Sequence, residues 1–285
     1  MELALGTVQF GLAYGAVGSG RQVDDDTARA ILNEAWAHGV RTLDTAAAYG
    51  DIEARLAGLC GPHDFRIVSK IAPLGRLSDP AERAEAVRAS VQRSLQRLGG
   101  RLRALLFHSV ADLEADDGPA LWDIARQTLA RSGQTVRLGV SGYAPEELQR
   151  LRAQLDIEIA QLPGNALDQR LHQHPPFDGV ELHVRSAFLQ GLLLAPARGA
   201  ARVPAAAAAL ARWQARCEQA GLSGQQAALG VVRGLPGVAC CVVGVETPAQ
   251  FNEIAEAWRH ATPQHWPELA CSDPDAWDPR RWPAG

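Results

Sequence analysis

The sequence predicts a single (β/α)8 barrel domain that comprises residues 1–285. Short apolar runs typical of strands alternate with longer amphipathic segments typical of helices, as in parallel α/β folds. Eight such pairs follow one another without a linker or a break in composition. Barrels of this kind have about 250 residues, so the length of the chain also fits.

The predicted strands are short runs rich in Val, Leu, Ile and Ala, each bounded by polar residues or glycine. In chain order they cover residues 3–8, 41–45, 66–71, 104–108, 136–140, 157–162, 179–184 and 238–243.

The segments between these runs carry helix signals. Three aspartates at residues 24–26 open the first helix and Gly39 ends it. Pro119 suits the first position of a later helix, and Gly99 closes the helix before it. The predicted helices cover residues 24–39, 49–60, 80–98, 119–130, 145 onward, 204–220, 224–234 and 248–260, with a weaker helical segment after Asn165.

The alternative fold is a doubly wound open sheet, which would place a G-x-G-x-x-G loop after the first strand. The glycine-rich residues 15–20 miss this spacing, and Arg21 and Gln22 follow where a phosphate-binding P-loop would have Lys and Ser or Thr. We interpret this segment as a flexible lip of the barrel. From Thr262 the chain is rich in Pro, Trp and Asp, so we expect an irregular tail packed by Trp266, Trp277 and Trp282.

Composition narrows the class of protein. The formal charge of −4 argues against nucleic-acid binding, which needs a basic surface. No apolar run approaches the roughly 18 residues of a membrane span, and the N-terminus starts in an apolar strand without a signal peptide, so we expect a cytoplasmic protein. The five cysteines lack C-x-x-C spacing; Cys240 and Cys241 are interpreted as buried thiols, and no metal site is expected. The oligomeric state does not follow from the sequence.

Ionisable side chains follow three consecutive predicted strands: Asp44, Lys70 and His108, with Tyr49 just beyond Asp44. The strand ends of a barrel share one face, which holds the active site, and neighbouring strands lie about 4.8 Å apart. Lys70 is the only lysine of the chain. A buried lysine needs a carboxylate, which Asp44 can supply. A cation beside a phenol is expected to lower the pKa of Tyr49 from about 10 and to suit it for proton transfer.

Each of these residues also has a structural interpretation. Asp44 can cap a helix and Tyr49 can pack at a rim. Lys70 can be a surface cation and His108 a core histidine. The four together favour a proton-transfer site, in which His108 orients the group that receives the proton or relays it.

Several motifs resemble those of the aldo-keto reductases. They are Leu-Gly-Thr-Val-Gln-Phe-Gly at 5–11, Leu-Asp-Thr at 43–45 with Tyr-Gly at 49–50, Val-Ser-Lys at 68–70, Leu-Phe-His-Ser at 106–109, Gly-Val-Ser at 139–141, Gln-Leu-Pro-Gly-Asn-Ala-Leu-Asp at 161–168 and Arg-Ser-Ala-Phe-Leu-Gln-Gly-Leu-Leu at 185–193. The resemblance extends in order to about Trp258. It implies an NADP(H)-dependent carbonyl reductase on a (β/α)8 barrel, which acts on a small-molecule aldehyde or ketone.

The resemblance also implies residue roles. Tyr49 would be the proton donor, Lys70 its pKa-lowering neighbour, Asp44 the partner of the lysine, and His108 the group that orients the carbonyl. The cofactor-binding residues would be Gly6, Thr7, Ser141, Gln161, Asn165, Arg185, Ser186, Phe188, Gln190, Gly191, Gly244, Gln250 and Glu253.

Four positions depart from the family pattern, and one of them is Ile254, which replaces the usual asparagine. Gly142 stands where Asn is common, and Arg185 stands where many members have an aromatic residue that stacks on the nicotinamide. Gln250 replaces an arginine that pairs with the 2′-phosphate of NADPH, and residues 243–253 contain no cation. A phosphate usually binds a positive charge. NADP(H) is the expected cofactor, with NAD(H) as the alternative.

The predicted function is hydride transfer from the nicotinamide to an aldehyde or ketone, with Tyr49 as the proton donor. Two alternatives stay open. Lys70 could form a Schiff base in a lyase, or the chain could be a slow-turnover NADP(H)-binding sensor or partner protein. Phe10, Tyr14 and Trp122 are candidates to line the pocket or to pack the core.

Overall fold

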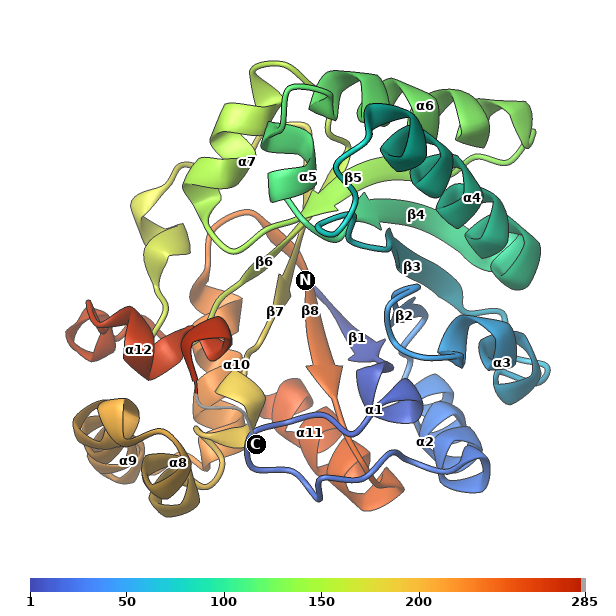
Figure 1. The fold of residues 1–285 in the computed structure, drawn as a ribbon. Helices are drawn as coiled ribbons and strands as arrows, with labels where there is room; N and C mark the ends of the chain where they lie inside the picture. Colours follow the sequence, from blue (N-terminus) through green and yellow to red (C-terminus); the bar gives the residue numbers. More distant parts are fainter. Residues whose placement is uncertain (283–285) are drawn as a thin grey trace.

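The computed structural model describes residues 1–282, so the last three residues of the predicted domain lie outside the described part. Eight parallel strands close into a barrel in sequence order (Figure 1). They are β1 Glu2–Gly6, β2 Thr42–Asp44, β3 Arg66–Ile71, β4 Leu102–Phe107, β5 Arg137–Ser141, β6 Ile159–Pro163, β7 Glu181–Arg185 and β8 Val238–Gly244.

Closure of the barrel is visible in the pairing of its first and last strands. β1 pairs with β8 in parallel from Glu2 opposite Cys240 to Gly6 opposite Gly244. An open sheet would leave both of these strands as edges. The predicted (β/α)8 barrel is therefore confirmed, and the doubly wound sheet is excluded.

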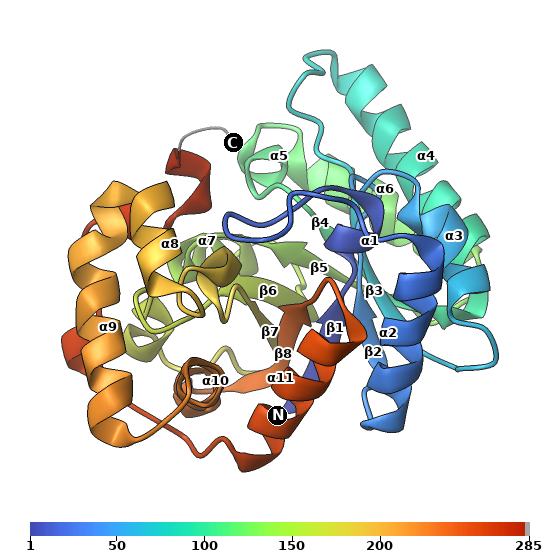
Figure 2. The same ribbon diagram turned by 90° about the horizontal axis from the view of Figure 1, so that it is seen from below.

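Helices surround the strands (Figure 2). The longer ones are α2 Asp25–Ala37, α3 Ile52–Leu59, α4 Pro80–Leu98, α6 Gly118–Arg131, α7 Pro145–Arg152, α9 Ala207–Ala220, α10 Gly224–Gly234 and α11 Pro248–His260. Their starts follow the predicted signals: the Asp24 side chain accepts from the N–H of Thr27 at 2.8 Å, and Thr247 caps α11 by accepting from Gln250. None of the helices within residues 1–282 is long and apolar enough to cross a membrane.

Four short helices were not predicted: α1 Val8–Gly11, α5 Ala111–Glu114, α8 Pro196–Arg202 and α12 Pro274–Trp277. Each has at most seven residues, which is too short to show a helical period in the sequence. The expected helical segment after Asn165 is only a 3-10 turn, Arg170–Gln173. The Asn165 side chain accepts from the N–H groups of Leu167 and Asp168, which fixes a turn where a helix would begin.

The tail from Thr262 is largely irregular, as expected, and its tryptophans hold it to the barrel. Trp266 is buried and lies 5.9 Å from the ring of Trp213. Trp277 donates its indole N–H to the carbonyl of Cys271, and Trp282 donates to the carbonyl of Asp275. Trp266 therefore packs the tail against α9, and the hydrogen bonds of Trp277 and Trp282 stabilise the tail internally.

The barrel interior is filled by small and medium apolar side chains that form two clusters, Val68, Ala104, Leu106 and Ile159, and Ala4, Cys240 and Val242. Side chains two residues apart on a strand point to the same face. Val68 and Lys70 therefore both face the barrel interior, and so do Ile159 and Gln161. On the first strand, Ala4 and Gly6 are the inward positions. The apolar clusters form the floor on which the polar site lies.

Candidate active site

The polar site lies at the carboxyl ends of the strands. Asp44 is the last residue of β2, Lys70 the penultimate residue of β3, and His108 follows β4 directly. Gln161 lies in β6 and Arg185 ends β7. Because all strands are parallel, these side chains converge on the face where barrel enzymes hold their active sites.

Asp44 and Lys70 form a buried ion pair. The Lys70 Nζ donates to Asp44 Oδ1 at 2.7 Å, to Asp44 Oδ2 at 2.8 Å and to the carbonyl of Thr45 at 2.9 Å. The Lys70 side chain is 1% exposed and the Asp44 side chain 8%. All three ammonium protons are thus bonded, so the predicted pair is confirmed. Gln161 Nε2 donates a further hydrogen bond of 2.7 Å to Asp44 Oδ1.

Tyr49 and His108 lie next to this pair. Their rings meet edge to face with centroids 5.7 Å apart, and the Lys70 Nζ lies 5.4 Å from the centre of the Tyr49 ring. The four side chains that the sequence singled out are therefore brought together at one place.

The pKa of Tyr49 shifts in the direction opposite to the one expected. Burial, followed by the nearby negative charge of Asp44, raises the pKa of Tyr49 above its ordinary value, while Arg185 opposes the shift. The predicted lowering is wrong in this geometry, because burial and the Asp44 charge together outweigh the effect of the Lys70 cation. Burial also lowers the pKa of Lys70, against the opposing effect of Asp44.

His108 is neutral near pH 7. Burial and then the Lys70 cation lower its pKa to about 4. Its Nδ1 is buried without a hydrogen-bond partner among residues 1–282. A neutral imidazole keeps one N–H donor and one acceptor. Tyr49 and His108 are thus two uncharged proton-bearing groups beside a fixed ion pair.

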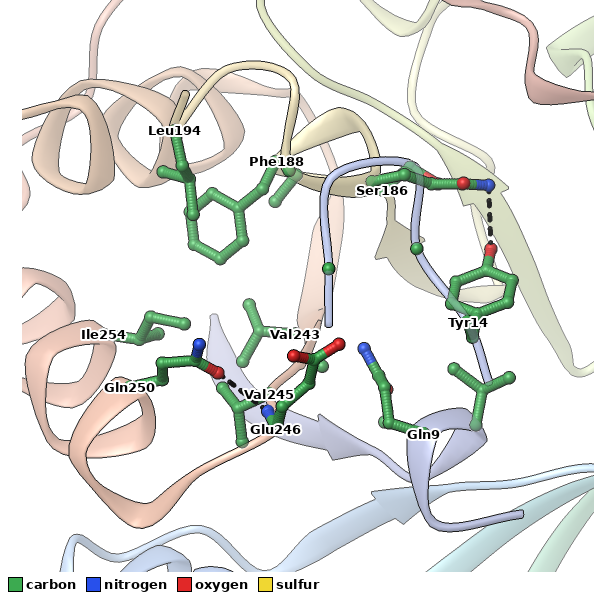
Figure 3. A pocket seen from close by; sticks show the side chains of 18 of the residues that line it. Gln9, Tyr14, Ser186, Phe188, Leu194, Val243, Val245, Glu246, Gln250 and Ile254 are labelled. Atoms are coloured by element: carbon green, nitrogen blue, oxygen red, sulfur yellow. Dashed lines mark hydrogen bonds between the residues drawn. The ribbon is translucent and has the colours of Figure 1, made fainter. Parts of the chain in front are cut away.

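A pocket of about 390 Å³ opens from this place toward α11 (Figure 3). Asp44, Tyr49 and Gln161 lie at its inner end, and Gln250, Glu253 and Ile254 at its outer end. The catalytic candidates Asp44 and Tyr49 line the pocket. Ten of the expected cofactor residues line it as well: Gly6, Gln161, Arg185, Ser186, Phe188, Gln190, Gly191, Gly244, Gln250 and Glu253.

One wall is a strained loop at residues 186–191. Ser186, Leu189 and Gln190 have φ values of 65°, 49° and 51°, which place them in the left-handed region, and they are the only non-glycine residues there within residues 1–282. Such backbone costs about 1–3 kcal/mol per residue and is concentrated at ligand sites. The loop is therefore shaped for the pocket at a cost in stability.

The glycine-rich segment forms a cover over the pocket, here called the roof loop (residues 14–19). On one side Tyr14 Oη accepts from Gln190 Nε2 at 3.1 Å, and the carbonyl of Val17 accepts from Arg198 at 3.2 Å. On the other side the N–H of Ser19 donates to both carboxylate oxygens of Glu246 at 3.0 Å. The segment expected as a lip thus crosses the pocket and is attached at both sides.

Five predicted site residues lie outside the pocket lining. Lys70 is buried against Asp44, and His108 lies beside Tyr49 and is partly exposed. Thr7 donates its hydroxyl to the carbonyl of Asp44 at 3.0 Å and so ties β1 to β2. Ser141 is buried at the end of β5. Asn165 is buried, and its side-chain oxygen forms the turn described above.

Gly142 and Arg185, two departures from the family pattern, are coupled in space. A Cβ at Gly142 would lie 2.8 Å from a Glu147 carboxylate oxygen, so a side chain here would have to displace the end of Glu147. The Gly142 carbonyl accepts from the Arg185 guanidinium at 3.0 Å. The guanidinium also lies 4.4 Å from the ring of Tyr143, and within residues 1–282 its hydrogen bonds go to the Ser186 hydroxyl and the Gly142 carbonyl, not to a carboxylate. It contributes an unneutralised positive charge to the pocket wall.

Several pocket residues were not predicted as site residues, notably Gln9, Val17 and Arg198. Val17 lies in a loop, and Gln9 and Arg198 lie in the short helices α1 and α8, where no periodic pattern indicates which side chains face the pocket. Tyr14, a candidate to line the pocket, does so, whereas Phe10 and Trp122 are buried in the core.

A closed parallel barrel with an ion-paired lysine, a tyrosine and a histidine beside a pocket at the carboxyl ends of its strands has the architecture of a barrel enzyme. The chain matches the model of the Aldo/keto reductase family over residues 2–269 and belongs to this family. Members of this family act on small carbonyl compounds and use nicotinamide cofactors.

Individual relatives are more distant. The chain is 28% identical over 186 residues to a D-threo-aldose 1-dehydrogenase from Pseudomonas sp., and this match covers 54% of the chain and 56% of that protein. The chain thus matches only about half the length of this curated relative. Among solved structures, a Pseudomonas aeruginosa protein assigned to the aldo-keto reductases is 27% identical, with 91% of this chain and 90% of that chain covered and a TM-score of 0.63.

Two further structures share the fold. A glycerol dehydrogenase from Gluconobacter oxydans is 21% identical, with 94% of this chain and 88% of that chain covered and a TM-score of 0.66. The holo form of an aldo-keto reductase from Bacillus halodurans is 19% identical, with 98% and 95% covered and a TM-score of 0.71.

Proposed function

We propose that this protein is an NAD(P)(H)-dependent reductase of aldehydes or ketones in which Tyr49 delivers the proton to the carbonyl oxygen. One observation carries the proposal: Tyr49 lines the inner end of the pocket beside a neutral His108, and the buried Asp44–Lys70 pair lies next to it. The family membership supports the same reaction class.

The inner pocket fits a nicotinamide. Gln161 Oε1 and Gln9 Oε1 are buried without a partner within residues 1–282, and such oxygens can accept hydrogen bonds from a carboxamide. Gly6 and Gly244 are register partners at the ends of β1 and β8, so no side chain projects there. Gln161 and Gln9 would hold the carboxamide, and the strained loop would lie against the phosphates. When bound, the nicotinamide supplies the hydride that reduces the carbonyl carbon.

The residues of the chain supply the proton and position the carbonyl. The raised pKa of Tyr49 keeps its phenol protonated near neutral pH, so its O–H can donate to the carbonyl oxygen. The proton moves from Tyr49 Oη to that oxygen as the carbon is reduced, and an alcohol results. The Lys70 charge stabilises the phenolate that remains, and neutral His108 orients the carbonyl by a hydrogen bond.

The geometry of Lys70 argues against the Schiff-base alternative. A lysine nucleophile needs a neutral amine that faces the substrate. Here all three positions of the ammonium group are bonded, and the side chain is buried behind the pocket wall.

The test is Tyr49→Phe, assayed with NADH and NADPH on a panel of aldehydes, and in the reverse direction on aldoses because of the relative named D-threo-aldose 1-dehydrogenase. General acid catalysis contributes roughly 10²- to 10⁴-fold, so kcat should fall by that amount. Cofactor affinity, measured by fluorescence titration, should stay within about twofold, which is well below one tenfold step of 1.4 kcal/mol.

The matched control is Tyr143→Phe, which removes the same hydroxyl from a ring outside the pocket lining. It should retain near-normal turnover. If Tyr49→Phe kept turnover similar to that of Tyr143→Phe, Tyr49 would not be the proton donor.

A further inference from the structure

The outer end of the pocket carries negative charge. Glu246 and Glu253 line it together with Gln250, all from the turn after β8 and the first turns of α11 (Figure 3). Residues 243–254 contain no lysine or arginine. The N–H of Glu246 donates to Gln250 Oε1 at 2.8 Å, so the amide oxygen of Gln250 is turned toward the backbone.

The outer end is also where the adenosine half of a dinucleotide would lie. Tyr49 marks the reacting end, and the pocket runs from there to α11. Phe188, Leu194 and Ile254 give this end apolar walls, which suit a purine. The adenosine ribose would then lie between these walls and the phosphate-binding loop, close to the Glu246 turn.

Glu246 has the properties of an acceptor for ribose hydroxyls. It is half-buried, its carboxylate has no cationic partner within residues 1–282, and it accepts only from the N–H of Ser19. A carboxylate beside an adenosine ribose accepts hydrogen bonds from its hydroxyls, whereas a 2′-phosphate is held by arginine or lysine. A phosphate monoester carries a charge of about −1.5 to −2 at pH 7, so the same carboxylate repels it.

We propose that the pocket selects NAD(H) over NADP(H), and that the Glu246 carboxylate is the residue that discriminates against the 2′-phosphate. This inference rests on the proposed function, because it concerns the cofactor of that site. It differs from the cofactor preference that the family resemblance implies.

Arg198 is the cation that could oppose this selection. Within the described part of the chain, Arg185 and Arg198 are the two cationic side chains that line the pocket. Arg198 belongs to α8 and donates to the Val17 carbonyl, so it lies on the opposite side of the roof loop from Glu246. From there it serves the pyrophosphate, which NADH and NADPH have in common.

The experiment measures equilibrium binding to the full chain without substrate. NADH and NADPH are titrated by fluorescence, and 5′-AMP and adenosine 2′,5′-bisphosphate compete against bound NADH to report on the adenosine end alone. We expect NADH to bind at least about tenfold more tightly than NADPH, since one charge-assisted hydrogen bond is worth that factor. Of the two fragments, 5′-AMP should bind more tightly than adenosine 2′,5′-bisphosphate.

Glu246→Gln keeps the size of the side chain and removes the charge. It should lower the NADPH-to-NADH ratio of Kd by about tenfold. The ratio is the correct readout, because loss of the contact with the roof loop affects both cofactors equally. Gln250→Arg, which adds a cation, should change the ratio in the same direction. Glu256→Gln is the control: this carboxylate lies on α11 outside the pocket lining and pairs with Arg259, so the ratio should not change.

The outcomes separate the two proposals. Failure of both cofactors to bind would overturn the proposed function and this inference with it. Equal or tighter binding of NADPH would overturn only the inference. If Arg198→Met weakened the binding of NADPH alone, Arg198 would hold the 2′-phosphate, and this result would also overturn only the inference. Equal weakening of NADH and NADPH binding would support it.

Discussion

Replacement of Lys70 by Met removes the cation from the Asp44–Lys70 pair. The variant loses three hydrogen bonds of 2.7–2.9 Å, and the 8% exposed Asp44 carboxylate keeps Gln161 as a side-chain donor. Methionine has a similar length, so packing changes little. The carboxylate is then buried without a compensating charge, which is the expensive outcome for an ion pair.

Removal of one partner from a buried pair costs about 3–5 kcal/mol. Natural domains are stable by only about 5–15 kcal/mol, so this loss is a large fraction of the total. Asp44→Asn should cost a similar amount, since it leaves the lysine cation uncompensated. The double variant Asp44→Asn with Lys70→Met buries two neutral groups. We expect its loss of unfolding free energy to be smaller than the sum of the two single losses by about 1–3 kcal/mol.

Urea unfolding, followed by the fluorescence of the seven tryptophans and by far-UV circular dichroism, measures these free energies. The control is Arg29→Met, which breaks the exposed pair of Arg29 with Asp26 and should cost less than about 1 kcal/mol. A loss in Lys70→Met no larger than in Arg29→Met would refute the buried-pair argument. Strict additivity in the double variant would refute the coupling.

Two further predictions concern His108 and the roof loop. His108 binds its proton near pH 6.5 in the unfolded chain but near pH 4 in the folded one, so stability should fall by about 3 kcal/mol as the pH drops from 6.5 to 4. His108→Gln should abolish this part of the fall in urea titrations at several pH values; an unchanged difference between pH 6.5 and 4 would contradict it. A Cβ at Gly18 would overlap Glu246 Oε1, so Gly18→Ala should loosen the roof loop and speed cofactor release in stopped-flow measurements by about tenfold, the effect of losing one charge-assisted contact. Release at the wild-type rate would show that the loop does not limit it.

The core of the site was predictable because a barrel brings the ends of its strands, which are far apart in the sequence, close together on one face. Asp44, Lys70 and His108 each follow an apolar run, and the closed barrel necessarily places such strand ends on one face. The single lysine in an arginine-rich chain then indicated a buried pair with Asp44, and the 2.7 Å contact bears this out. The eight strands followed from the same apolar pattern.

The rest of the pocket depends on contacts that no local pattern encodes. The roof loop has no hydrophobic period, and its course is determined by bonds to Gln190, Arg198 and Glu246, which lie more than 170 residues away in the chain. Asn165 lies outside the pocket lining, and its side-chain oxygen forms a local turn that the family position does not reveal. The direction of the Tyr49 pKa shift was wrong because burial, which a sequence does not give, outweighs the Lys70 charge.

The raised pKa of Tyr49 is consistent with a reductase. Reduction needs a protonated phenol, and the alkoxide that develops on the substrate is a stronger base than the phenolate, so a low pKa is not required for proton transfer. Alcohol oxidation needs the phenolate instead, which burial and Asp44 disfavour at neutral pH. Arg185 acts in the opposite direction: its uncompensated charge lowers the pKa of Tyr49 and, at the pocket wall, disfavours a second positive charge such as that of an oxidised nicotinamide. The net shift of the Tyr49 pKa is still upward and favours the protonated acid, and the Arg185 charge favours the reduced cofactor, so we expect carbonyl reduction to be the faster direction near pH 7.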